Sequence, residues 1–294
     1  MLSVFLFIFG AAIGSFLNIA ASRYDPGRGV FSLKSIGGRS HCPKCSHQLA
    51  WFDLIPLASF LYLFGKCRYC RGKISLQYPA VEIVAGFIFL LPLYFYERFQ
   101  IASALALGEP LLWYYALAAI WVMALYVLLV LSLIDLRLYI IPDSVNVFLG
   151  ILGIFKAVSL YFFYKFDLVA GTFLGNYALL FGLRENVFVN HALAALIGAA
   201  VFGIIIYVTR GKGMGMGDLK LAAALGLLLG WPDILLVVTL SFILGSLYGI
   251  PGLIRGKYTM KDAVPFGPFM VLGAVATMFF GHKLLELYFT AFNL

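Results

Sequence analysis

Long runs of apolar residues without charge constrain the fold of this chain more than any other feature. Several windows of about 20 residues hold almost no charged side chain, and a helix of that length spans a hydrocarbon core of about 30 Å. The whole chain is 63% hydrophobic and 12% charged, with a mean hydropathy of +0.99. Strands of a β-barrel would alternate polar and apolar residues, and these runs do not. The sequence therefore predicts an all-α polytopic membrane protein surrounded by the lipid bilayer.

The apolar runs predict about eight transmembrane helices. In chain order they cover residues 1–22, 79–97, 111–134, 144–164, 188–208, 219–231, 233–254 and 264–288. The first run lacks a basic segment before it, which favours a spanning helix over a cleaved signal peptide. The sixth run is short for a full crossing, so we expect it to be tilted or to lie where neighbouring protein thins the bilayer.

These spans divide the chain into four parts. They are the first transmembrane helix (1–22), a polar lobe (23–78), a second transmembrane helix with its outer loop (79–110), and a six-helix domain (111–294). The connection 165–187 inside the last part is rich in Gly, Phe and Leu and could itself re-enter the bilayer. No internal repeat is evident from the sequence.

The distribution of Lys and Arg predicts how the chain is oriented. Positive charges concentrate in 23–78, which places this lobe in the cytoplasm and the N-terminus outside. Alternating the spans from there keeps the later cytoplasmic loops basic, while the outer loops hold only Arg98, Lys165 and Arg184. The formal net charge of +8 then marks topology, and we expect no nucleic acid partner.

All four cysteines fall in the lobe, as two Cys-x-x-Cys pairs. Cys42 and Cys45 form the first pair and Cys67 and Cys70 the second, with 21 residues between the pairs. Two such turns supply the four thiolates of a tetrahedral structural zinc site, and a reducing cytoplasm disfavours disulfides. Closed coordination leaves no position for water, so the zinc should be structural, and its removal should loosen the lobe alone. The neighbouring His41 and His47 could compete as ligands, but we expect them to be solvated.

Acidic residues inside the spans are candidates for chemistry because burying them is costly. Asp135 ends the third span and Asp218 begins the sixth, so the predicted topology puts both at the cytoplasmic ends of their helices. Two carboxyls close together in a poorly hydrated site cannot both ionise cheaply. The ionised one can then act as general base on a water while the protonated one polarises a peptide carbonyl. This arrangement predicts an aspartyl protease.

Glycines and alternative roles bear on this assignment. Gly213, Gly215 and Gly217 precede Asp218 and would let a substrate backbone come close. Asp218 could instead cap the sixth helix, since Asp fills that role well. Asp143 follows Pro142 at the start of the fourth span and is better explained as a helix cap than as a member of the pair.

Two other readings of the acids remain open. A proton-coupled transporter would use buried carboxyls as a proton relay, and a zinc-containing scaffold would bind partners without catalysis. Glu82 could be a first-turn acid favoured by the helix dipole. His191 and His282 are expected to be packing or interfacial residues.

Several motifs occur in an order that is specific to one family. They are Gly14-Ser15-Phe16-Leu17-Asn18, the two Cys-x-x-Cys pairs, Tyr78-Pro79-Ala80-Val81-Glu82, Ile134-Asp135, Ile141-Pro142-Asp143, Gly215-Met216-Gly217-Asp218 and Pro265-Phe266-Gly267-Pro268. With them the chain resembles the bifunctional type IV prepilin peptidases, which are aspartyl proteases with a GxGD motif.

The resemblance implies both substrate and cofactors. It implies cleavage of the basic leader from prepilins and pseudopilins of type IV pili or type II secretion, after a glycine, at the bacterial inner membrane. It also implies N-methylation of the new amino terminus with S-adenosylmethionine, assigned to the lobe (23–78) and the adjoining helices, in which Glu82 would take part. Asp135 and Asp218 would be catalytic, with Gly215, Gly217 and Asp143 supporting them. The chain departs from the family at Asp53, where asparagine is expected, and at 165–187, which resembles an insertion.

Overall fold

The described part of the chain is helical and contains no strand. The structure, a computed structural model, describes residues 1–27, 37–98, 111–163, 171–181, 186–256 and 264–292. Parts of the lobe (28–36), of the connection 165–187 (165–170 and 182–185) and of the loops (99–110 and 257–263) lie outside the described residues.

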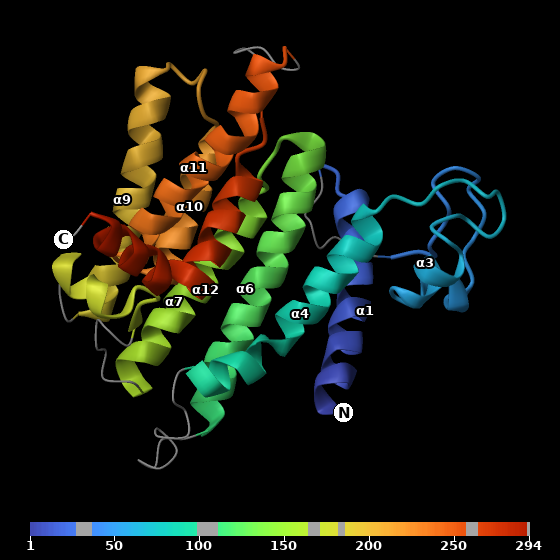
Figure 1. The fold of residues 1–294 in the computed structure, drawn as a ribbon, viewed down its shortest axis with the longest axis horizontal. Coiled ribbons are helices and arrows are strands. Elements are labelled where there is room, and N and C mark those ends of the chain that lie inside the picture. The colour runs from blue at the N-terminus through green and yellow to red at the C-terminus, as the bar shows by residue number, and fades with distance from the viewer. Residues whose placement is uncertain (28–36, 99–110, 164–170, 182–185, 257–263, 293–294) are drawn as a thin grey trace. The chain divides into compact units, whose positions relative to one another are not determined.

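All eight predicted spans are helices (Figure 1). They are α1 (Leu2–Ser22), α4 (Gln77–Arg98), α6 (Leu111–Leu138), α7 (Asp143–Phe163), α9 (Val187–Val208), α10 (Met216–Leu229), α11 (Asp233–Ile254) and α12 (Gly267–Ala291). The shorter elements are the 3-10 helices η1 (Trp51–Leu54) and η2 (Gly175–Phe181) and the helix α3 (Ala58–Tyr62). The all-α membrane fold is thereby confirmed.

The helices differ in whether they could cross a bilayer alone. Six of them are long and apolar enough. In α4 the apolar stretch is shorter, Gln77–Leu93, and α10 has only 14 residues. At 1.5 Å per residue α10 measures about 20 Å, less than the hydrocarbon thickness of about 30 Å. The short sixth helix of the prediction is therefore real.

The chain forms two compact units, Met1–Leu133 and Ile134–Leu294, with the boundary inside α6. In the first unit α1 packs directly on α4 at two glycines. A Cβ at Gly10 would lie 2.6 Å from Phe89 Cβ, and one at Gly14 would lie 2.5 Å from Ala85 Cβ. Small residues four apart let helix backbones approach in membranes, where van der Waals contact drives helix association.

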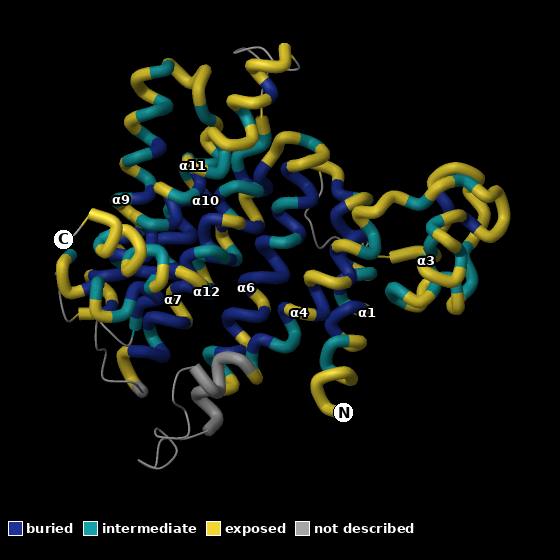
Figure 2. Tube along the Cα trace, in the orientation of Figure 1, coloured by how far each residue is buried: buried dark blue, intermediate teal, exposed yellow. Residues whose placement is uncertain are grey.

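In the second unit α10 is enclosed by its neighbours, and much of its trace is buried (Figure 2). It runs parallel to α7. Lys220 near its start donates to Asp143 at the start of α7, and Leu228 near its end accepts from Lys156, further along α7. A Cβ at Gly153 would lie 2.6 Å from the carbonyl carbon of Leu227, so the two backbones are in contact there.

Polar side chains complete the C-terminal end of α10. Lys156 Nζ, fully surrounded by protein, donates to the carbonyls of Leu228 (2.9 Å) and Leu229 (3.2 Å). His191 Nδ1 donates to the carbonyl of Leu227 at 2.7 Å. A helix end leaves carbonyls without intrahelical partners, and in an apolar interior these must find donors. With donors supplied from α7 and α9, α10 can end inside the protein.

The described part of 165–187 packs against the turn between α10 and α11. Asp233, the first residue of α11, accepts from Thr172 Oγ1 and from the backbone N–H of Phe173. Trp231 Nε1 donates to the carbonyl of Phe181 at 3.0 Å, and Ala178 is fully buried. Residues 171–181 thus supply protein contacts where α10 has already ended. The depth of this segment in a bilayer stays a prediction.

Candidate active site and metal centre

Asp135 lies in the last turn of α6, which runs to Leu138 and so extends beyond the predicted end at 134. Its side chain is buried, and its Oδ2 accepts from the backbone N–H of Gly267 at 2.9 Å. Gly267 is the first residue of α12. The free N–H groups of a helix start attract negative charge, so α12 orients this carboxyl.

Asp218 is the third residue of α10, and the helix cap is Gly215. The alternative interpretation, in which Asp218 itself caps the helix, is therefore wrong by three positions. Its Oδ2 instead reaches back to the backbone N–H of Gly215 at 3.1 Å, the contact made by the acid of a capping box. The carboxyl is half-buried and close enough to Asp135 for the two groups to interact electrostatically.

Asp143 lies outside this pair. It is exposed and forms an ion pair with Lys220 at 2.7 Å, which ties the start of α7 to the start of α10. At Gly217 the backbone of α10 lies close to the side chain of Ile141, because a Cβ at Gly217 would be only 3.1 Å from Ile141 Cβ. Gly213 donates its N–H to Thr209 Oγ1 at 3.1 Å and closes the turn after α9.

The carboxyl groups of Asp135 and Asp218 have the same pattern of hydrogen bonds. Each has one carboxylate oxygen held by a backbone N–H, from Gly267 for Asp135 and from Gly215 for Asp218. Among the described residues, the other oxygen of each carboxyl has no hydrogen-bond partner. An acid with one fixed and one available oxygen can exchange a proton with water or with a peptide carbonyl.

The four cysteines of the lobe form one cluster. The Sγ atoms of Cys42, Cys45, Cys67 and Cys70 all lie within 4.8 Å of one another, and those of Cys42 and Cys70 are 3.9 Å apart. Zn–S bonds of about 2.3 Å in a tetrahedron place sulfurs about 3.8 Å apart, so the donor set fits such an ion. Burial of the Cys42 thiol opposes its ionisation, but the backbone N–H groups of Cys45 and Lys44, together with the thiols of Cys45 and Cys67, lower its pKa to about 7.

The two pairs belong to a structural repeat that the sequence analysis missed. We name residues 40–49 the first knuckle and residues 65–74 the second. Three backbone hydrogen bonds recur in both knuckles. In the first knuckle they run from Cys42 N to His47 O, from Ser46 N to Cys42 O and from Leu49 N to Ser40 O. In the second knuckle the corresponding bonds run from Cys67 N to Gly72 O, from Arg71 N to Cys67 O and from Ile74 N to Gly65 O. Ser46 and Arg71 share a left-handed backbone, with φ of 56° and 57°. The aligned Cys-x-x-Cys spacing, followed four residues later by Leu49 or Ile74, was the available signal.

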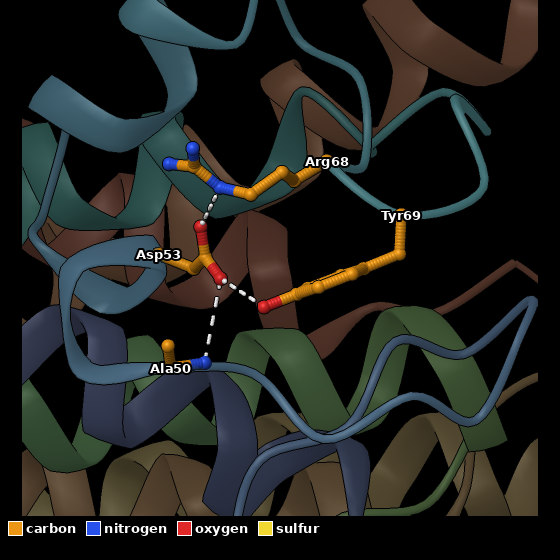
Figure 3. Close-up of polar contacts among 4 residues, drawn as sticks. All are labelled: Ala50, Asp53, Arg68 and Tyr69. Carbon is orange, nitrogen blue, oxygen red and sulfur yellow. Dashed lines mark hydrogen bonds and ion pairs between the residues drawn. The ribbon is translucent and has the colours of Figure 1, made fainter.

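Asp53 lies in the segment between the knuckles, residues 50–64, which we name the connector. Its buried carboxyl accepts from Arg68 Nε at 2.8 Å, from Tyr69 Oη at 3.3 Å and from the backbone N–H of Ala50 at 3.3 Å (Figure 3). The hydrogen bond from Arg68 to Asp53 raises the pKa of that guanidinium. The acid at this departure from the family pattern therefore braces the connector against the second knuckle.

Glu82 holds the same connector to the membrane helices. Its Oε2 accepts from the backbone N–H of Leu57 at 2.8 Å. Because α4 begins at Gln77, Glu82 lies in its second turn, and the first-turn interpretation was wrong. Its described contacts are thus structural. Participation of Glu82 in methyl transfer stays a prediction.

The histidines and the remaining buried polar groups show what sequence reasoning missed. His282 Nδ1 donates to the carbonyl of Leu174 at 3.2 Å, so like His191 it binds backbone inside the bundle. In the first knuckle His47 packs against Tyr69, with ring centroids 3.7 Å apart and the rings tilted by 32°. Lys156 and Asp233 were visible as charges within predicted spans, but only acids at the cytoplasmic ends were weighed.

Comparisons with known proteins connect these features. The family model described as the bacterial peptidase A24 N-terminal domain matches residues 8–96, which include the cysteine cluster and Glu82. The type IV leader peptidase family model matches residues 178–250, which include Asp218. Asp135 falls between the two matched ranges.

Relatives match over most of the chain. A protein of Burkholderia pseudomallei (strain 1026b) is 32% identical over 94% of this chain and 85% of its own length. One of Bacillus subtilis (strain 168) is 29% identical over 98% of both chains. One of Aeromonas hydrophila is 28% identical over 98% of this chain and 93% of its own. Each is named prepilin leader peptidase/N-methyltransferase. No solved structure matches the chain.

Proposed function

This chain belongs to the prepilin leader peptidase/N-methyltransferase family, and we propose that Asp135 and Asp218 carry out its leader cleavage as a pair. It is a multi-pass membrane enzyme, a protease that also has N-methyltransferase activity, and its substrates are prepilins. The transporter alternative receives no support from the comparisons.

The geometry that carries this proposal is a pair of carboxyls in one compact unit, each with one oxygen held by a backbone N–H at a helix start. The two carboxyls also interact electrostatically. In the resting site one carboxyl is ionised and the other keeps its proton, because like charges repel strongly where water is scarce. The ionised carboxylate takes a proton from a water, which attacks the scissile carbonyl carbon. The protonated carboxyl donates to the carbonyl oxygen, and a proton then returns to the leaving amine.

The charge pattern of the chain supports a site at the cytoplasmic side of the inner membrane. Arg137 follows Asp135 by two residues, and Arg210 and Lys212 lie in the loop that leads into α10, the helix of Asp218. Basic residues next to spans favour the cytoplasm. A substrate with a basic leader and an apolar helix would present the junction between them at that level, where the two acids lie.

The lobe completes the proposal. The four cysteines would hold a structural zinc ion, whose binding would stabilise a segment too small to fold by apolar burial. S-adenosylmethionine is the methyl donor that the second activity requires.

The test is cleavage of a prepilin by the purified protein in lipid nanodiscs, followed by mass spectrometry. Asp135→Asn and Asp218→Asn keep an oxygen that can accept from Gly267 or Gly215, so both should fold and bind metal as the wild type does. Each should lose cleavage by about 10³-fold or more, and the double variant should lose little beyond either single one. Asp143→Asn, the control, should retain substantial activity. Processing at the wild-type rate by either variant of the pair would refute the assignment.

A further inference from the structure

Asn146 is a buried polar residue that the mechanism above does not use. It lies in the first turn of α7 and is only 7% exposed. Both amide atoms of its side chain, Nδ2 and Oδ1, are buried and have no hydrogen-bond partner among the described residues. Native proteins leave few such groups, because a buried donor or acceptor without a partner costs free energy. An amide left in this state calls for a ligand that supplies both an acceptor and a donor.

The position of Asn146 on α7 places it against α10. Residues 146, 150 and 153 recur at helical spacing and therefore share one face. Gly153 on this face touches the backbone of Leu227, and a Cβ at Gly150 would lie 3.7 Å from a methyl carbon of Leu227. The face that carries Asn146 is therefore the one that packs on α10.

The parallel register of the two helices sets the level of Asn146. Gly153 is level with Leu227, so seven residues earlier on both helices Asn146 is level with Lys220. The contact of Lys156 with Leu228 gives the same result to within one turn, level with Asp218. The ion pair of Lys220 with Asp143 places it slightly further along, level with residue 223. Asn146 thus lies level with the first two turns of α10, the first of which carries Asp218. The next residues of α10 are small, namely Ala222, Ala223 and Ala224.

We propose that the side-chain amide of Asn146 binds the substrate backbone next to the scissile bond, an inference that rests on the proposed function. A peptide bond can be cleaved only where the substrate helix is locally unwound, and unwinding leaves its N–H and C=O groups without partners in an apolar site. The amide of asparagine offers one donor group and one acceptor, the complement of a peptide unit.

The direction of α7 indicates which side of the scissile bond is bound. From Asp143 the helix runs away from the proposed cytoplasmic end, and Asn146 lies about 4.5 Å further along its axis. The leader stays in the cytoplasm, so the substrate residues at this depth are those that follow the scissile bond. Asn146 therefore binds the backbone, and not the side chains, of the first residues of the mature pilin.

A matched pair of variants separates this role from a structural one. Asn190 in α9 is also buried, but both polar atoms of its side chain are hydrogen-bonded. Its Nδ2 donates to the carbonyl of Trp231 at 2.8 Å, and its Oδ1 accepts from the backbone N–H of Trp231 at 2.9 Å. Asn190→Leu should lower the midpoint of thermal unfolding. Asn146→Leu should leave it unchanged or raise it, because an apolar side chain replaces an amide without partners. It should nevertheless lower kcat/KM about 10- to 100-fold.

The decisive experiment combines Asn146→Leu with backbone-modified substrates. Full-length protein in nanodiscs is given prepilin peptides in which a single amide after the cleavage site is replaced by an ester, which removes one N–H donor. At one position the ester should lower kcat/KM of the wild type and have no further effect on Asn146→Leu. At the other positions its effect on the two proteins should be equal.

Three results would overturn the inference while leaving the proposed function intact. They are ester effects that combine independently with Asn146→Leu at every position, a variant with the kcat/KM of the wild type, and a variant that loses thermal stability as Asn190→Leu does. A wild-type protein that cleaves none of the unmodified peptides would instead overturn the proposed function itself.

Discussion

Replacing Lys156 with Met tests whether polar contacts at the C-terminal end of α10 hold that helix in place. Met has nearly the length of Lys but neither its charge nor its donors. The substitution removes the hydrogen bonds to the carbonyls of Leu228 and Leu229 and a positive charge that interacts with Asp233. Asp233 keeps its bonds from Thr172 and Phe173.

The magnitude follows from these contacts. A hydrogen bond from a charged donor contributes about 1.5–3 kcal/mol, so the two bonds together contribute about 3–6 kcal/mol. Relief from burying the ammonium offsets part of this loss. We expect a net decrease in the free energy of unfolding of about 2–4 kcal/mol, which for a unit of this size lowers the melting temperature by about 4–16 °C.

The assay is thermal unfolding in detergent or nanodiscs, with Lys220→Met as the matched control. Lys220 pairs with Asp143 at the exposed start of the same two helices, and exposed ion pairs contribute at most about 1 kcal/mol. Adding Asp233→Asn to Lys156→Met should restore part of the lost stability. The double variant no longer buries a carboxylate at position 233 without the positive charge of Lys156. A melting temperature for Lys156→Met no lower than that of Lys220→Met would refute the reasoning.

Two further predictions concern the lobe. Chelating zinc, or replacing Cys45 with Ser, should increase hydrogen exchange in both knuckles and leave exchange in α10 unchanged; equal loss of protection in α10 would contradict a metal that acts on the lobe alone. Glu82→Gln keeps an acceptor for the N–H of Leu57 and should protect the connector from exchange as the wild type does, whereas Glu82→Ala should expose it. A Gln variant with a protected connector but no methylation of the cleaved pilin would show that Glu82 also acts chemically.

The elements that sequence predicts well here are those dictated by a single strong force. Transfer of apolar side chains into lipid defined all eight helices, and the spacing of Cys42, Cys45, Cys67 and Cys70 defined the cluster of four cysteines. Local hydrogen bonding was harder to foresee. Asp218 belongs to the cap of its helix, but at the third position, because Gly215 occupies the cap itself.

Features that depend on tertiary contacts escaped prediction. Lys156 reads as an unfavourable charge in an apolar run until the carbonyls at the end of α10 are placed beside it. Asn146 resembles any polar residue of a first helical turn, and its lack of partners emerges only from packing against α10. Glu82 was interpreted from its position in α4, whereas its partner Leu57 comes from the lobe.

The duplicated knuckles imply that the supply of metal affects the two activities of this enzyme differently. The ion would join the two knuckles at the ends of the connector, and the resulting short closed loop presents the N–H of Leu57 to Glu82. Loss of the ion would free both ends of the connector and raise the entropic cost of keeping the hydrogen bond between Leu57 and Glu82. We expect zinc-starved cells to retain leader cleavage, because the two acids proposed for it lie in the other compact unit, while methylation fails because the lobe is detached from α4.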